Sequence, residues 1–272
     1  DINGDGYADI IFGFGNLNLE DVDQDYNGSL DNTDGMVEIL HGASLETLIA
    51  KQFIQTWTTF LSPTGSREAS FGNDIAIGDV NRDGYDDIII GAPYADESAL
   101  YDKDQGAIYI IYGQASLYIN TYNASALSYS LNNYGSSIQY FSLYSEFDDA
   151  EFGEAVAVVD LNGDDIDDIA VSMSEYGFIG GEGFVFIYLG RGPADPDVAV
   201  LIHGIAEGSG LGNGRNSLQN LGDVNGDGFD DLGMKDTDGR FFILWGKSNW
   251  TANYDVDEDG FNDVYLIDLS VV

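Results

Sequence analysis

Residues 71–113 read FGNDIAIGDVNRDGYDDIIIGAPYADESALYDKDQGAIYIIYG, and this stretch contains three signatures that recur along the chain. A Phe-Gly pair opens it, and a nine-residue loop of the form Asp-x-Asn-x-Asp-x-x-x-Asp follows. Six mostly apolar residues between two glycines close it. The apolar runs that flank the loop are partly β-branched, which is typical of strands. The stretch therefore predicts a strand, an acidic loop and two further strands.

The acidic loop occurs four times, at residues 1–9, 79–87, 160–168 and 223–231. Side-chain oxygens at positions 1, 3, 5 and 9, with a backbone carbonyl at position 7, have the spacing that surrounds one calcium ion. Glycine at position 6 permits the sharp turn around that ion. We therefore expect four Ca2+ sites. Their ligands are Asp1, Asn3, Asp5, Tyr7 and Asp9; Asp79, Asn81, Asp83, Tyr85 and Asp87; Asp160, Asn162, Asp164, Ile166 and Asp168; and Asp223, Asn225, Asp227, Phe229 and Asp231.

These loops differ from EF-hands, which carry Glu at position 12 and a helix on each side. Position 12 is instead Phe12, Ile90, Val171 or Met234, within an apolar run. The ninth residue would then close each site from the start of the outgoing strand. Asp165 replaces glycine at position 6 of the third loop, which costs backbone strain but adds a carboxylate. The alternative is an ordinary hairpin turn, although plain turns do not require oxygen ligands at four positions in every copy.

Two further matches lie outside this register. One would use Asp255, Asp257, Asp259, Phe261 and Asp263, and the other Asp23, Asp25, Asn27, Ser29 and Asp31. An apolar run follows the first of these, as in the four main loops. Polar residues follow the second, so an acidic surface loop is an equally good interpretation there.

The Phe-Gly pair and the Gly-bounded segment recur in a constant order with the acidic loops. Gly-bounded segments lie at 35–42, 106–113, 183–190 and 239–246, and a Phe-Gly or Leu-Gly pair stands at 71–72, 152–153 and 211–212. Four strands per unit of about 60–80 residues is typical of a propeller blade. We therefore predict an all-β fold in one region, 1–272, with approximate repeats 1–70, 71–151, 152–210 and 211–272. It would be a β-propeller of four-stranded antiparallel blades, either a closed ring or an arc of a larger one.

The two ends of the chain depart from the regular unit. The sequence starts inside a loop without an initiator Met or a signal peptide, so we expect a processed or truncated segment. Residues 255–272 are either an insertion in the fourth blade, with VYLIDLSVV as its outer strand, or the start of a fifth blade.

Together, FG…GDVNRDGYDDIIIGAP…GAIYIIYG resembles the FG-GAP repeat of integrin α-subunit β-propellers and of bacterial surface proteins. The Gly-Ala-Pro triplet itself occurs once, at 91–93. This resemblance covers nearly the whole chain and implies calcium at one rim of a propeller, outside the cell, in adhesion or ligand-binding proteins. Integrin-type propellers usually have seven blades, so the four repeats here depart from that pattern.

The net charge of the chain argues against some classes of binding partner. The chain has 48 acidic and 9 basic residues and a formal net charge of −39, which repels nucleic acid and anionic membranes. No apolar run is long enough to insert into a membrane. The absence of Cys fixes no compartment, but weak calcium sites fill readily at extracellular calcium concentrations, so we expect an extracellular or cell-surface location.

No catalytic constellation is found in the sequence. It lacks Cys, a Gly-x-Ser-x-Gly elbow and His-Glu-x-x-His, and the glycine-rich residues 204–214 lack the spacing of a phosphate loop. Both histidines, His41 and His203, lie beside apolar residues and are interpreted as structural. We therefore expect a protein that is not an enzyme.

Several long segments are candidates for ligand contact: the Tyr-rich residues 116–147, the insertion 16–34 and the loop 92–105. The alternative for the Tyr-rich segment is the outer strand of its own blade. We predict a recognition or adhesion module for protein or carbohydrate on the cell surface or matrix. The alternatives are a calcium-dependent homo-oligomer or assembly (a filament, sheath or surface coat) and a non-catalytic domain of a larger secreted enzyme.

Overall fold

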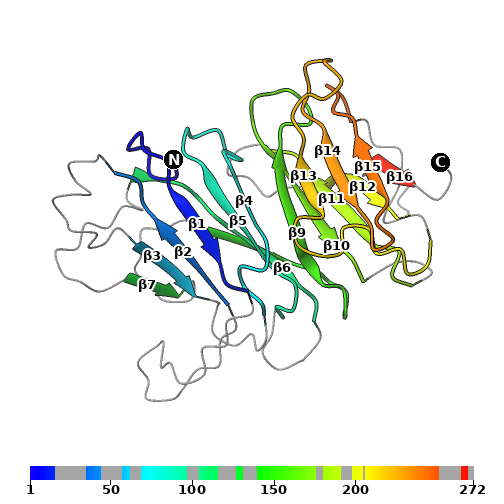
Figure 1. Ribbon diagram of the computed structural model, residues 1–272, viewed down its shortest axis with the longest axis horizontal. Coiled ribbons are helices and arrows are strands. Elements are labelled where there is room, and N and C mark those ends of the chain that lie inside the picture. The colour runs from blue at the N-terminus through cyan, green and yellow to red at the C-terminus, as the bar shows by residue number, and fades with distance from the viewer. Residues whose placement is uncertain are drawn as a thin grey trace.

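A computed structural model describes residues 1–15, 35–43, 57–61, 69–96, 104–115, 127–130, 140–175, 180–190, 198–204, 206–250 and 265–268. The secondary structure of these residues is all β (Figure 1). The strands are β1 (Ile10–Gly13), β2 (Met36–Leu40), β3 (Trp57–Leu61), β4 (Ile75–Gly78), β5 (Asp87–Ala92), β6 (Ala107–Ile111), β7 (Leu127–Ser130), β8 (Tyr140–Tyr144), β9 (Phe152–Val159), β10 (Asp168–Met173), β11 (Phe184–Tyr188), β12 (Val198–His203), β13 (Leu218–Asn220), β14 (Leu232–Lys235), β15 (Phe241–Leu244) and β16 (Tyr265–Asp268).

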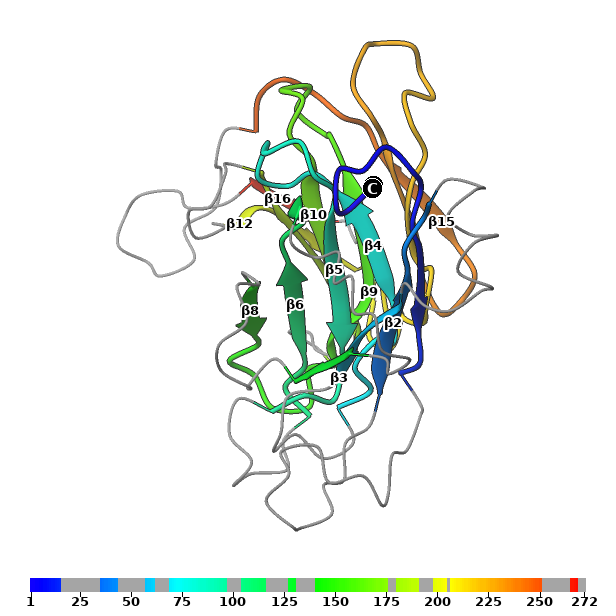
Figure 2. The same cartoon turned by 90° about the vertical axis from the view of Figure 1, so that its left-hand side faces the viewer.

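The strands form four sheets, which we call blades 1 to 4 because their arrangement is consistent with the blades of a β-propeller. Blade 1 has the order β1-β2-β3-β7, and blade 2 the order β4-β5-β6-β8. Blade 3 is β9-β10-β11-β12-β16, and blade 4 is β13-β14-β15. Figure 2 shows the strands of blade 2 side by side. Within each blade, consecutive core strands pair antiparallel, because the loops that join them are hairpin connections.

The prediction of uniform four-stranded antiparallel blades is wrong at the outer edges. β16 pairs parallel with β12 in blade 3, so Tyr265–Asp268, the described part of VYLIDLSVV, are neither the outer strand of blade 4 nor the start of a fifth blade. β7, from the Tyr-rich segment, pairs parallel with β3 of blade 1. The same segment also supplies β8, the antiparallel outer strand of its own blade, as the alternative interpretation held. Edge strands can come from distant segments because an unpaired strand edge accepts any chain that reaches it.

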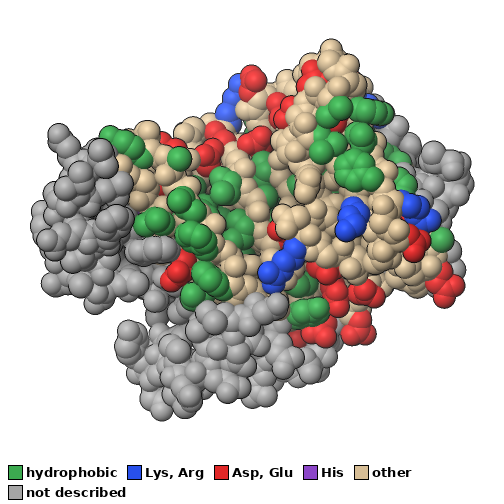
Figure 3. All heavy atoms as spheres, in the orientation of Figure 1, with side chains coloured by type: hydrophobic (Ala, Val, Ile, Leu, Met, Phe, Trp, Pro, Cys, Tyr) green, Lys and Arg blue, Asp and Glu red, His purple; other side chains and the backbone are tan. Residues whose placement is uncertain are grey.

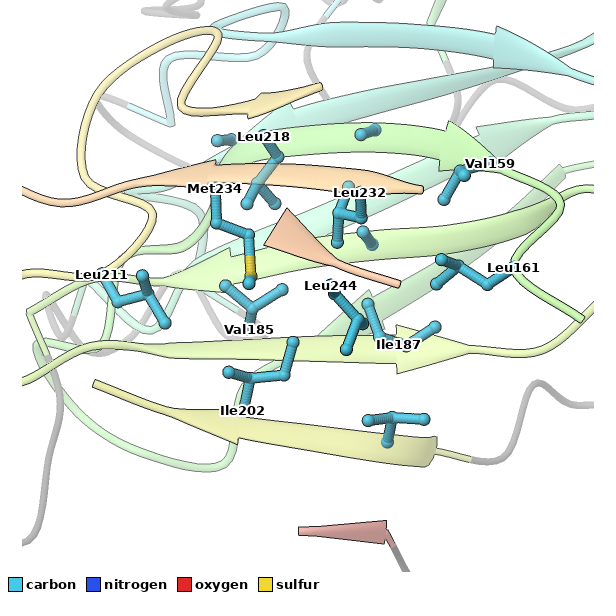
Figure 4. Close-up of a cluster of buried hydrophobic side chains, with 14 residues drawn as sticks. Val159, Leu161, Val185, Ile187, Ile202, Leu211, Leu218, Leu232, Met234 and Leu244 are labelled. Atoms are coloured by element: carbon cyan, nitrogen blue, oxygen red, sulfur yellow. The ribbon is translucent and has the colours of Figure 1, made fainter. Parts of the chain in front are cut away.

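The blades pack face to face, and three apolar clusters lie between them. Val37, Ile39 and Phe60 of blade 1 meet blade 2, and Ile89, Ile108 and Ile110 on the other face of blade 2 meet blade 3. Figure 4 shows the third cluster, in which Val185, Ile187 and Ile202 of blade 3 lie near Leu232 and Leu244 of blade 4. Because the inner blades are covered on both faces, β5 and β10 are buried at every residue and read as unbroken apolar runs.

The glycine signatures mark places where two blades approach each other through backbone. Gly35 and Gly106 form parallel bridges with Phe71 and Phe152, which open the next blade. A Cβ on Gly106 would lie 2.2 Å from the backbone nitrogen of Phe152. The Phe-Gly pair of one unit and the first glycine of the preceding Gly-bounded segment are therefore two sides of one contact.

None of the described residues forms a helix with the length and apolarity needed to cross a membrane.

Candidate metal-binding loops

The four acidic loops all lie at one end of the blades, and they lead into β1, β5, β10 and β14 (Figure 1). The described residues include all of the loops at 1–9, 79–87, 160–168 and 223–231. The two further predicted sites, at 23–31 and 255–263, lie outside the described residues.

Each loop is folded by its own carboxylates. The position-1 Asp accepts hydrogen bonds from the backbone N–H groups of positions 5 and 6, at 2.7–3.2 Å in all four loops. The position-3 Asn side chain also accepts from the position-5 N–H, and the position-5 Asp accepts from the position-7 N–H, at 2.8–3.1 Å. The side-chain oxygens of positions 1, 3 and 5 are thereby held around one concave turn.

The ninth position has a different role, because its carboxylate is buried beneath the loop. Asp87, Asp168 and Asp231 are fully buried, and the Asp9 side chain is 2 % exposed. One oxygen accepts the N–H of the loop's second residue, and the other accepts the N–H of the glycine that ends the Gly-bounded segment, at 2.8–3.1 Å. The glycines concerned are Gly42, Gly113, Gly190 and Gly246. Sequence reasoning assigned these aspartates only as ligands and missed that they tie the loop to the third strand, although the constant order of the two signatures is a signal of that contact.

Burial raises the pKa of Asp87 to about 7 and that of Asp168 to about 8. The two backbone N–H groups on each carboxylate act in the opposite direction, while the Asp residues at positions 1 and 5 of the same loop raise the pKa further. A buried carboxylate among other carboxylates is stabilised by a proton or by a bound cation. The electrostatics of these two loops thus favour a positive charge.

Neighbouring loops also contact one another. The Tyr85 ring, at position 7 of the second loop, covers Gly4 at position 4 of the first, and the Phe229 ring covers Gly163 in the same way. A hydrogen bond of 3.1 Å runs from the N–H of Asp167, at position 8, to the carbonyl of Asp79, at position 1 of the preceding loop. The loops therefore form a continuous row along this end of the molecule.

Two departures from the loop pattern meet at one place. Arg82 replaces glycine at position 4 of the second loop, and Asp165 replaces glycine at position 6 of the third. The Arg82 guanidinium donates to the carbonyl of Asp164 at 3.1 Å and lies 3.8 Å from the Asp165 carboxylate. Both residues have positive φ, at 60° and 59°. The extra carboxylate of the third loop therefore faces the only basic residue in any of the four loops.

The donor set of the loops is that of a hard cation site, namely carboxylate, amide and carbonyl oxygens. Among the described residues, no group of three or more His, Cys, Asp or Glu side chains has the arrangement of a metal site. The loops therefore have suitable donor atoms and a preformed turn, but their oxygen atoms would have to move closer together to coordinate an ion.

Both histidines are packed as structural residues, as the sequence indicated. His41 is buried, and its Nε2 lies 2.8 Å from the Thr58 hydroxyl. Burial lowers its pKa, against the opposing effect of Asp9. His203 is buried against the Phe184 ring and lies 3.4 Å from the Glu182 carboxylate.

At the opposite end of the blades, Asp74 is a residue that sequence reasoning missed. It follows the Phe-Gly pair of blade 2, and its carboxylate accepts the N–H of Val156 in blade 3 at 3.1 Å and the N–H of Asn216, before blade 4, at 3.3 Å. Burial raises its pKa, against the effect of these hydrogen bonds. One side chain thus links three consecutive blades.

The candidate ligand-contact segments are only partly described. The insertion 16–34 lies outside the described residues, as do 97–103 of the loop 92–105 and 116–126 and 131–139 of the Tyr-rich segment. In the described part of that segment, the Tyr144 hydroxyl is 2.7 Å from that of Tyr109, so Tyr144 packs within blade 2. Residues 206–217, which include most of the glycine-rich stretch, form turns that lead into β13.

The sequences of two of these units match a known family. The family model described as FG-GAP repeat matches residues 71–111 and 152–188. These two segments are FG-GAP repeats. Each FG-GAP match starts at a Phe-Gly pair that contacts the preceding blade and extends through the acidic loop into the Gly-bounded strand.

Curated relatives carry the comparison over more of the chain. Integrin alpha-4 of Xenopus laevis is 27% identical over 205 residues, which cover 72% of this chain and 18% of that protein. Integrin alpha-IIb of Mus musculus is 34% identical over 173 residues, covering 62% and 15%. Phosphatidylinositol-glycan-specific phospholipase D of Bos taurus is 32% identical over 158 residues, covering 54% and 17%. The chain spans less than a fifth of the length of each of these relatives.

Proposed function

We propose that the chain is an extracellular, calcium-stabilised FG-GAP β-propeller module that recognises a protein or carbohydrate ligand. The observation that carries the calcium half is the repetition of one loop four times, each with the same carboxylate-bonded turn and the same buried ninth Asp. An ordinary turn does not require a buried Asp at the ninth position. A cation bound by both the turn and the ninth Asp would account for the turn carboxylates and for the buried Asp together.

Charge supports a divalent cation as the bound species. The chain has a formal net charge of −39, and its loops bring several carboxylates close together. Calcium suits the oxygen donors and the flexible loop better than magnesium, which requires near-ideal octahedral geometry. In the proposed role, the ligands are the residues at positions 1, 3, 5, 7 and 9 of each loop, and calcium rigidifies the end of the blades.

Recognition is the second half of the proposal and rests on the relatives. Two observations favour an adhesion-type module: the FG-GAP repeats and the similarity to integrin alpha subunits. Long segments between the strands, such as 92–105 and 116–147, offer the residues for ligand contact. Similarity to a phospholipase D favours the alternative of a non-catalytic domain in a larger enzyme. In either case the 272 residues act by binding rather than by catalysis, and the inter-blade loops and the end opposite the acidic loops meet the ligand.

Thermal unfolding in 2 mM CaCl2, 2 mM MgCl2 and excess EDTA tests the calcium half. Metal that binds only the folded state adds about 2 kcal/mol per site when its concentration is about 20 times Kd. Several filled sites should therefore raise Tm by more than about 10 °C in calcium and by less in magnesium.

Two variants make this test specific. Asp83→Asn removes an exposed position-5 carboxylate and should reduce the calcium-induced shift, with little change in EDTA. Glu207→Gln removes one exposed charge from a turn outside the loops and should leave the shift intact. Equal Tm values in calcium and EDTA would refute calcium binding. For the recognition half, a glycan and matrix-protein array probed with the intact chain should give calcium-dependent binding, and an array without signal would count against it.

A further inference from the structure

Neighbouring acidic loops are joined through position 8 of one loop and position 1 of the loop before it. The N–H of Asp167 donates to the carbonyl of Asp79 at 3.1 Å, and the N–H of Asp230 donates to that of Asp160 at 3.3 Å. Figure 3 shows Asp and Glu side chains along this end of the molecule. Position 8 is not a proposed ligand, but it lies between two of them, at positions 7 and 9. The backbone of the later loop therefore contacts a ligand residue of the earlier one.

At two of the junctions, the side chain at position 8 also contacts the preceding loop. One oxygen of the Asp167 carboxylate accepts the N–H of Asp79 at 2.9 Å. The Asp86 carboxylate accepts a hydrogen bond from the nitrogen of Asp1 in the same way, at 2.6 Å. Asp167 thus holds both the N–H and the carbonyl of Asp79, whose own carboxylate is a proposed ligand. A displacement of Asp167 therefore moves the first ligand of the second loop.

A glycine makes room for the Asp167 side chain. Gly78 precedes the second loop, and a Cβ on it would lie 2.3 Å from an oxygen of the Asp167 carboxylate. The residue before the third loop is Val159 instead, and the position-8 carboxylate of the fourth loop, on Asp230, accepts the side-chain N–H of Asn220 at 3.3 Å. Asp167 and Asp230 therefore occupy the same position in their loops but differ in the partner of the side chain.

A second contact joins the second and third loops. The Arg82 guanidinium donates to the carbonyl of Asp164 at 3.1 Å. Arg82 lies between the proposed ligands Asn81 and Asp83 of the second loop, and Asp164 is a proposed ligand of the third. The ion pair of Arg82 with Asp165 is exposed on both sides and contributes little by itself. The two loops are thus connected at two separate points, through residues that are ligands or lie next to ligands.

We propose that the second and third loops bind calcium cooperatively, with Asp167 as the positioning residue that couples them. This inference rests on the calcium-binding function proposed above. Ligation by the third loop fixes Ile166 and Asp168, and so it fixes Asp167 between them. Asp79 is then already in place for ligation by the second loop, which loses less conformational freedom when it binds. The coupling is reciprocal because it is a property of the equilibrium.

Electrostatic repulsion opposes this coupling. A divalent cation in one loop reduces the negative potential at its neighbour, and this weakens the binding of a second cation. Salt screens the repulsion, with a Debye length of about 8 Å at 0.15 M ionic strength. The hydrogen bonds of Asp167 act at shorter range and are screened less. Cooperative binding in about 0.15 M NaCl therefore shows that the positional coupling exceeds the repulsion.

Glycine amide signals in NMR spectra report on each loop separately. Gly84 is the only glycine of the second loop, and Gly163 is the only glycine of the third. Their N–H groups donate to the position-1 carboxylates, Asp79 and Asp160, at 2.9 and 2.8 Å. A calcium titration of the 272-residue chain, labelled with nitrogen-15 at glycine, therefore gives an apparent Kd for each of the two loops.

Disabling one loop measures its effect on the other. Asp164→Ala removes an exposed position-5 carboxylate of the third loop and keeps the carbonyl that Arg82 contacts. It should raise the Kd of the second loop about 5-fold or more. Asp83→Ala, the corresponding change in the second loop, should raise the Kd of the third by the same factor. The signal of Gly153, at the far end of β9, should not move in either variant, which checks the fold.

Asp167→Ala tests the positioning residue, and Asp230→Ala is its matched control. In the Asp167→Ala chain, the further change Asp164→Ala should alter the Kd of the second loop by less than about 2-fold. In the Asp230→Ala chain, the factor of about 5 or more should remain, since that side chain bonds to Asn220. Loss of a negative charge shifts the Kd of the second loop alike with the third loop intact or disabled, so it leaves the ratio unchanged.

Three results would overturn the proposal. They are a Kd of the second loop that Asp164→Ala leaves unchanged, an effect of Asp164→Ala that persists in the Asp167→Ala chain, and an effect that Asp230→Ala abolishes as well. Each of them leaves calcium binding itself intact. Glycine signals of the loops that do not move in calcium would instead refute the calcium proposal and this inference together, so the two failures are distinguishable.

Discussion

The inter-blade backbone contact at Gly106 gives a sharp prediction, because the chain contains its own control. Gly106 and Gly239 open corresponding Gly-bounded segments, with φ of +81° and +80°. A Cβ on Gly106 would lie 2.2 Å from the backbone nitrogen and 2.3 Å from the backbone oxygen of Phe152. A Cβ on Gly239 would meet nothing within 4 Å. Alanine at either position therefore carries the cost of positive φ, but only at position 106 does it also overlap the Phe152 backbone.

The shared cost is the positive φ, which destabilises an L-residue by about 1–2 kcal/mol. At Gly106, the Phe152 backbone would also have to retreat by about 1 Å to restore van der Waals separation. Overpacking of this kind adds about 1–3 kcal/mol. We expect Gly239→Ala to lower the free energy of unfolding by about 1–2 kcal/mol and Gly106→Ala by about 2–5 kcal/mol.

Urea unfolding followed by tryptophan fluorescence, with calorimetry alongside, measures the difference. For a domain of this size, 1 kcal/mol corresponds to about 2–4 °C in Tm, so Gly106→Ala should melt roughly 2–12 °C below Gly239→Ala. Equal losses for the two variants would mean that φ alone accounts for the glycine. The close approach of blades 2 and 3 would then not be the reason for the Gly-bounded signature.

Three further predictions concern charge and the loops. Burial and the nearby Glu154 raise the pKa of Glu151 to about 7, so the folded state binds this proton more tightly than the unfolded state, and in EDTA the free energy of unfolding should fall as pH rises from about 4.5 to about 7. Glu151→Gln should flatten this slope in urea melts at a series of pH values, and parallel profiles for the two proteins would contradict the prediction. Asp87→Asn leaves one of the N–H groups of Val80 and Gly113 without an acceptor, at a cost of about 1–3 kcal/mol. Calorimetry in calcium should therefore show a lower Tm and a smaller calcium-induced shift, and an unchanged Tm would show that this carboxylate does not hold the loop to the third strand. Tyr85→Ala uncovers Gly4 and should speed hydrogen exchange in residues 1–9 but not in 223–231, whereas uniform changes would argue against a local contact.

Local features of the fold followed from the sequence because they depend on neighbours in the chain. The acidic loops, the apolar strands after them and the Gly-bounded strands stand where their patterns placed them, as β5, β6, β10, β11, β14 and β15 illustrate. A turn held by its own carboxylates and a strand buried on both faces are encoded within about ten residues. The FG-GAP match over two of these units confirms the family resemblance that the same residues indicated.

The arrangement of distant segments was decided only by the tertiary structure. Periodicity could show that Leu127–Ser130 and Tyr265–Asp268 are strands, but not that they join blades 1 and 3 in parallel, since a sheet edge accepts a strand from any part of the chain that can reach it. Similarly, the ninth Asp was readable as an oxygen ligand, but its burial and its bond to a glycine 15 to 33 residues away arise only when the third strand packs beneath the loop. Sequence alone determined the repeating unit and its chemistry. Packing between units decided which edges are paired and which carboxylates are buried.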